Sequence, residues 1–112
     1  MNQTPKQEVK RKIVTLCGSP EFKTEFKDIF RSLTLMDNVV LIAPILDQPS
    51  PGDRLDWCDD GTITMLSRLS KYKVNMSDSV YVINKNHIVD DDTKDLINYA
   101  VAKGKPIQYY CN

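Results

Sequence analysis

Short apolar runs that alternate with helical segments constrain the fold of this chain more than any other feature. Runs rich in β-branched residues cover residues 12–17, 38–45 and 79–84, and a shorter one covers 106–110. Runs of this kind, bounded by Gly, Pro or Asp, are typical of buried strands. Strands that alternate with helices pair in parallel through right-handed crossovers. We therefore predict an α/β fold: a three-layer, flavodoxin- or Rossmann-like sandwich around a parallel four-stranded sheet of order 2-1-3-4.

The helices between these runs are predicted from caps and periodicity. Ser19 and Pro20 match the N-cap and the first residue of a helix. Its core-facing stripe is predicted to be Phe22, Phe26, Ile29, Phe30 and Leu33. A weaker helix is predicted over about residues 57–75, and its apolar side is Ile63, Leu66, Leu69 or Ser70, and Val74. The run Asp-Asp-Asp-Thr over residues 90–93 is expected to cap the last helix, and Gly104 is expected to end it.

The length favours one domain, and the balanced charge gives the chain no overall attraction to polyanions. The chain has 112 residues, of which 41% are apolar, which suits one compact core. Fifteen basic and fifteen acidic residues cancel, so we expect neither nucleic acid nor a membrane as a partner. No apolar run approaches the roughly 20 residues of a membrane span. We expect a cytoplasmic protein with a flexible tail over residues 1–11 and a single domain over 12–112.

The cysteines and the one histidine form neither a disulfide framework nor a metal-ligand pattern. Cys17, Cys58 and Cys111 are odd in number and widely spaced, so we expect reduced thiols, no metal and no cofactor. Cys17 closes the first predicted strand and is expected to fill the core. The alternative, a nucleophilic thiol, needs a base nearby. His87 is expected to be solvated.

The predicted topology also locates a ligand site. In open parallel sheets, ligands bind beyond the carboxyl ends of the strands, where the strand order reverses. For the order 2-1-3-4 this point lies between the first and third strands. Trp57 ends a long loop over about residues 46–56 and is placed either to stack on a base or to anchor the loop. The expected ligand-binding residues are Cys17, Gly18, Ser19, Trp57, Asn84, Asp90, Asp91 and Thr93.

Three stretches, in order, resemble the nucleoside 2-deoxyribosyltransferase-like superfamily, and in particular its small bacterial and phage members. They are residues 15–19, 76–84 and 99–106, and the resemblance covers roughly residues 12 to 110. It implies a flavodoxin-like fold and a homo-oligomer in which a neighbouring subunit helps complete the site. It also implies a glutamate nucleophile three residues before Tyr99. That position is Leu96, which cannot attack a sugar.

Further departures from the family pattern fall on the same side of the predicted fold. Pro20-Glu21 stands where the family commonly has Thr-Arg, Ser70 stands where a histidine is common, and Asp90 stands at a common glycine position. We therefore expect a catalytically degenerate pseudoenzyme that binds or sequesters a nucleoside or nucleotide-derived small molecule.

Two other functions are compatible with the sequence. In the first, a displaced acid, Asp91 or Asp92, replaces the missing nucleophile in an active N-glycosidase or deoxyribosyltransferase. The alternative to this catalytic role is that both side chains cap the helix. In the second, the chain is a protein-interaction module that keeps only the fold and uses the Pro-rich loop with Trp57 as its contact surface.

Overall fold

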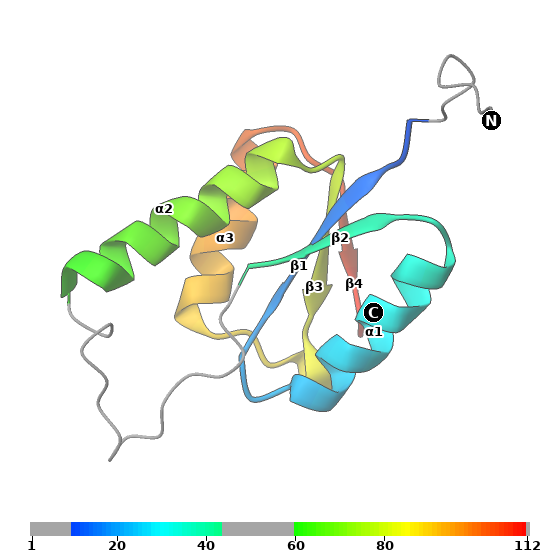
Figure 1. Ribbon diagram of the computed structural model, residues 1–112. Coiled ribbons are helices and arrows are strands. Elements are labelled where there is room, and N and C mark those ends of the chain that lie inside the picture. Colours follow the sequence, from blue (N-terminus) through cyan, green and yellow to red (C-terminus); the bar gives the residue numbers. More distant parts are fainter. Residues whose placement is uncertain (1–9, 44–59, 112) are drawn as a thin grey trace.

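The computed structural model describes residues 10–43 and 60–111, and these form an open α/β sandwich (Figure 1). The strands pair in parallel in the order β2-β1-β3-β4, while α1 covers one face and α2 and α3 cover the other. The predicted fold class and strand order are confirmed. The elements are β1 (Ile13–Gly18), α1 (Lys23–Leu35), β2 (Val39–Ile42), α2 (Asp60–Met76), β3 (Ser79–Ile83), the 3₁₀ turn η3 (Lys85–His87), α3 (Asp91–Ala102) and β4 (Ile107–Tyr109).

Two segments predicted from the sequence fall largely outside the described ranges. The predicted tail contributes only its last two residues to the described part, and Arg11 donates to the Asp37 carboxylate at 2.9 Å. The predicted loop over residues 46–56, and Trp57 after it, lie wholly outside.

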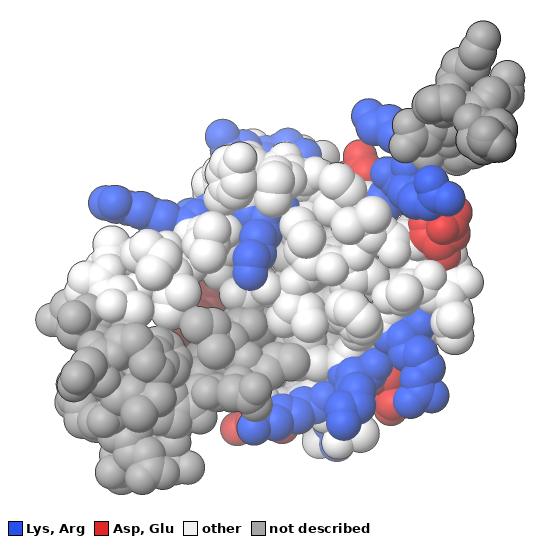
Figure 2. Space-filling model, viewed as in Figure 1, with Lys and Arg blue, Asp and Glu red and all other residues white. Residues whose placement is uncertain are grey.

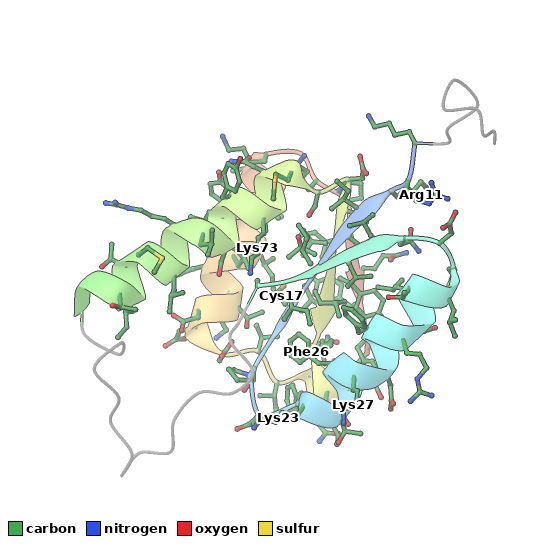
Figure 3. All side chains as sticks on the ribbon, viewed as in Figure 1. Arg11, Cys17, Lys23, Phe26, Lys27 and Lys73 are labelled. Carbon is green, nitrogen blue, oxygen red and sulfur yellow. The ribbon has the colours of Figure 1, made fainter. Side chains whose placement is uncertain are left out.

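Each face of the sheet has its own apolar core. On the α1 face, the predicted helical stripe is confirmed except at Phe30, which is 40% exposed. Figure 3 shows Phe26 pointing from α1 toward the sheet, where it is fully buried. The core on the α2 and α3 face consists of Cys17, Ala43, Val74, Val80, Val82, Leu96 and Ala100.

The prediction that Ser19 caps the first helix is wrong. The backbone N–H of Phe22 donates to the Ser19 carbonyl at 3.1 Å, so the chain first reverses in a turn, and α1 begins only at Lys23. The Ser19 hydroxyl accepts from the N–H of Glu21, inside that turn. Within the predicted capping run of the last helix, Asp90 is the N-cap, because its carboxylate accepts from the N–H of Thr93 at 3.1 Å, while Asp91 and Asp92 lie in the first turn.

The predicted inward side of the second helix is correct in part: Val74 is fully buried and Leu66 and Ser70 are half-buried, but two of the predicted residues face solvent. Ile63 and Leu69 are exposed, at 56% and 42%. The side of α2 that meets the sheet also carries polar side chains that bond to the sheet. Ser70 Oγ donates to the Ala43 carbonyl at 2.9 Å, and Lys73 Nζ donates to the Ile42 carbonyl at 2.7 Å.

A buried pair of hydroxyls extends this polar contact to β1. Thr15 and Ser77 are almost completely buried, and their hydroxyl groups form a short hydrogen bond with each other. Ser77, which directly follows α2, also donates from Oγ to the Lys73 carbonyl in the last turn of that helix at 2.8 Å. Val74 adds one fully buried apolar side chain between the polar positions. Hydrogen bonds therefore orient α2 on the sheet as much as apolar burial does.

Strand β2 lies at the edge of the sheet, and a lysine protects its open side. The N–H groups of Val39 and Ala43 donate to carbonyls of the β1 segment, at 2.8 and 2.9 Å. Since alternate residues of a strand bond to the same neighbour, the backbone N–H and C=O groups of Val40 and Ile42 point toward the open edge. The ammonium group of Lys73 donates a hydrogen bond to the Ile42 carbonyl there (Figure 3). A lysine at this place hinders pairing with a further strand.

Gly18 permits the close approach of the ends of β1 and β3. A Cβ atom at residue 18 would lie 2.7 Å from the backbone carbonyl oxygen of Ile83, which cannot move without disturbing β3. Gly104, with φ of 72°, ends α3 as predicted, and a Cβ there would meet nothing within 4 Å.

These two glycines give a matched stability test. We expect Gly18→Ala to lower the free energy of unfolding by about 3 kcal/mol, the upper range for overpacking. Gly104→Ala should cost only about 1 kcal/mol, because it meets backbone strain without a clash. Urea denaturation monitored by circular dichroism measures both. Equal losses for the two variants would contradict the close approach.

Candidate functional site

The strand order reverses between β1 and β3, as predicted, and the candidate site lies at their carboxyl ends. β1 pairs with β2 on one side and with β3 on the other, and Gly18 lies in register with Ile83. From this point α1 passes to one face of the sheet and α3 to the other (Figure 1). The edge is therefore built from the turn after Gly18, the residues after Ile83, and the first turn of α3.

Cys17 lies inside this edge as a neutral thiol. Its side chain is 1% exposed and faces the core under α2 and α3 (Figure 3). Burial, together with the negative charge of Asp90, raises the pKa of Cys17 to about 12. At neutral pH the thiol is therefore protonated, and a protonated thiol is a poor nucleophile. The prediction that Cys17 fills the core is confirmed.

Asn84 holds the chain that follows β4. Its side-chain Nδ2 donates to the Cys111 carbonyl at 3.0 Å, and its Oδ1 accepts from the Cys111 N–H at 2.7 Å. Both polar atoms of the amide thus have backbone partners. The geometry gives Asn84 a structural role beside the ligand contact predicted for it.

The first turn of α3 presents acids to the same edge. The Asp90 side chain caps the helix by accepting a hydrogen bond from the N–H of Thr93, and Thr93 is 4% exposed. Asp91 and Asp92 are exposed and lie at the positive end of the helix dipole. Their carboxylates are free to meet a ligand from solvent. Ser19, 8% exposed, supplies a hydroxyl from the β1 side.

Leu96, at the position where the family resemblance implies a nucleophile, is a core residue. It is 6% exposed and packs in the same cluster as Cys17, Val82 and Ala100. A carboxylate with these neighbours would lose its hydration without gaining a charged partner.

Sequence reasoning missed an ion pair beside the site. Lys85 Nζ lies 2.9 Å from Glu25 Oε2, which ties the first turn of α1 to η3. The hydrogen bond from Lys85 lowers the pKa of Glu25, and the same bond raises the pKa of Lys85. No local pattern indicates this pair, because its members lie far apart in the sequence and meet only in the fold.

The residues that the structure describes include no group of three His, Cys, Asp or Glu side chains that could hold a metal ion. His87 is exposed, as predicted. Within those same ranges no helix is long and apolar enough to cross a membrane.

Replacing Leu96 tests the nature of this position. Leu96→Glu should destabilise the fold by about 2–7 kcal/mol, because a carboxyl group enters an apolar core without a partner. Leu96→Met, which keeps the volume, should cost less than about 1.5 kcal/mol.

The loss in Leu96→Glu should depend on pH. Burial raises the pKa of the introduced carboxyl group above its unfolded value of about 4.3. The folded state then binds more protons than the unfolded state, so stability falls as pH rises from about 4 and levels off above the raised pKa. Denaturation at several pH values measures this slope. A stability difference that is independent of pH would show that the position is solvated.

Comparison with models of known protein families found none that matches this chain, and comparison with curated proteins found no match either. The geometry of the described residues therefore carries the functional argument.

Proposed function

We propose that the carboxyl edge between β1 and β3 binds a nucleoside or a nucleotide-derived small molecule without cleaving it. The observation that carries this proposal is the state of the two inward positions at that edge. Leu96 is a buried hydrocarbon, and Cys17 is a buried, protonated thiol. The edge keeps the topology of a ligand site while neither inward position supplies a nucleophile.

The polar groups at the edge favour a ligand with several hydroxyl groups. Asp91 and Asp92 can accept hydrogen bonds from sugar hydroxyls, and bonds to a charged acceptor are worth about 1.5–3 kcal/mol each. Ser19 adds a hydroxyl that both donates and accepts. Phosphate groups placed near Asp91 and Asp92 would be repelled. These features support an uncharged nucleoside as the better ligand and a nucleoside monophosphate as the weaker one.

A reaction that uses Asp91 or Asp92 as a displaced nucleophile has less support. Attack on a sugar needs a carboxylate oxygen held at about 3 Å from the anomeric carbon. Both side chains lie exposed in the first turn of α3, and the structure gives neither a hydrogen bond that would fix its orientation. Binding without cleavage is the function that this geometry favours.

Calorimetry with a panel of ribonucleosides, deoxynucleosides and their monophosphates tests the proposal. We expect at least one nucleoside to bind more tightly than its monophosphate. The double variant Asp91→Asn/Asp92→Asn should raise the dissociation constant for that nucleoside about tenfold, equivalent to about 1.4 kcal/mol. Asp95→Asn, an exposed change one helical turn further along α3, is the matched control and should leave the constant unchanged.

Two results would contradict the proposal. If no nucleoside bound at millimolar concentration, nucleosides would be excluded as the ligand class. Release of free base from a deoxynucleoside, abolished by Asp91→Ala or Asp92→Ala, would show an enzyme that uses a displaced acid.

A further inference from the structure

The outer face of α2 carries an exposed apolar stripe. Its members are Met65, Leu69, Tyr72 and Met76, which are 50%, 42%, 59% and 45% exposed. Their spacing of four, three and four residues puts them on one side of the helix. An ordinary surface helix buries such a stripe and exposes its polar side. In α2 the side that meets the sheet combines Ser70 and Lys73 with the fully buried Val74, and this second apolar stripe faces solvent.

Basic residues flank this α2 stripe on both sides. Lys71 Nζ lies 5.8 Å from the centre of the Tyr99 ring, which places Lys71 and the neighbouring Arg68 on the flank toward α3. Lys73 lies on the flank toward β2, where it reaches the Ile42 carbonyl. Figure 2 shows the surface over the middle of α2 as uncharged apart from Lys and Arg side chains.

The part of α2 that carries these three cations contains no acidic residue. The sequence from residue 61 to residue 77 contains neither Asp nor Glu. Within the described ranges, the ion pairs Arg11–Asp37 and Lys85–Glu25 both lie away from α2. The stripe is therefore an apolar surface between two positive borders.

We propose that the α2 stripe binds an amphipathic helix with acidic flanks on another protein. Apolar residues at spacings of three and four fit the corresponding positions of a second helix. Two of the four members are methionines, whose flexible side chains adapt to a partner surface. Acidic flanks on the partner would meet Arg68 and Lys71 on one side and Lys73 on the other. Charge complementarity of this kind steers association and fixes the register.

The same charges disfavour a second copy of this chain. Both flanks of the stripe are basic, so two copies of α2 would bring like charges together in either the parallel or the antiparallel direction. Addition of a strand to the neighbouring β2 edge is opposed by Lys73, which occupies the outward Ile42 carbonyl. An anionic membrane is a poorer fit as well, because recognition of acidic lipids takes about four to eight clustered basic residues.

Two designed peptides test the partner chemistry on the full chain. Both are helices of about 21 residues, or three heptads, with Leu at the two core positions. One carries Glu at the flanking positions and the other carries Lys. Fluorescence anisotropy of the labelled peptides should show that the Glu peptide binds at least tenfold more tightly than the Lys peptide. Raising the salt from about 0.1 M to about 1 M should reduce that preference.

Variants of exposed residues locate the contact. Leu69→Gln/Tyr72→Gln should weaken binding of the Glu peptide at least tenfold, and Arg68→Glu should weaken it selectively relative to the Lys peptide. Since these side chains are exposed, thermal unfolding should be unchanged in each variant. Val101→Gln, at an apolar α3 residue that is 62% exposed, is the control and should bind as the unaltered protein does.

Four outcomes would overturn the proposal. They are equal binding of the two peptides, no binding of either, and binding that Leu69→Gln/Tyr72→Gln leaves intact. The fourth is a dimer in sedimentation velocity, or adsorption to phosphatidylserine vesicles, that this double variant abolishes. That result would make a second copy or an anionic lipid surface the occupant.

Discussion

The buried hydrogen bond between Thr15 and Ser77 determines how α2 lies on the sheet. It fixes one side of the helix over β1, and Ser70 and Lys73, on the same side, bond the carbonyls at the end of β2. Leaving any of these polar groups buried without a partner would cost about 1–3 kcal/mol. With Ser70, Lys73 and the buried Val74 directed to the sheet, Met65, Leu69, Tyr72 and Met76 face solvent. The partner surface proposed on α2 follows from this constraint.

The candidate site depends on how α3 docks. Leu96 and Ala100 are buried against the same face of the sheet as Cys17. Their burial brings the start of α3, with Asp91 and Asp92, to the carboxyl end of β1. The packing that buries Leu96 thus also places two exposed carboxylates at this edge of the sheet. The proposed binding without cleavage rests on both features.

Local patterns were enough to predict the strands, the cap of α3 and its end at Gly104, because each depends on residues close together in the sequence. The strand order followed instead from the general topology of alternating strands and helices. The orientation of α2 was predictable only in part, because Ser77 and Lys73 count as surface residues until their distant partners, Thr15 and Ile42, are known. The Glu25–Lys85 pair and the contact of Asn84 with Cys111 were not predicted for the same reason, because their partners lie far apart in the sequence. The position of Ser19 was misjudged because Ser-Pro-Glu also suits the turn that precedes α1.

The orientation of α2, with Ser70 and Lys73 toward the sheet and Tyr72 toward solvent, is tested most directly by a comparison of two unfolding free energies. Ser77→Ala removes a buried hydroxyl and should cost about 1–3 kcal/mol. Tyr72→Gln removes an exposed apolar side chain and should change stability by less than about 0.5 kcal/mol. If Tyr72→Gln were instead the more damaging change, the apolar side of α2 would face the core and the account would be wrong.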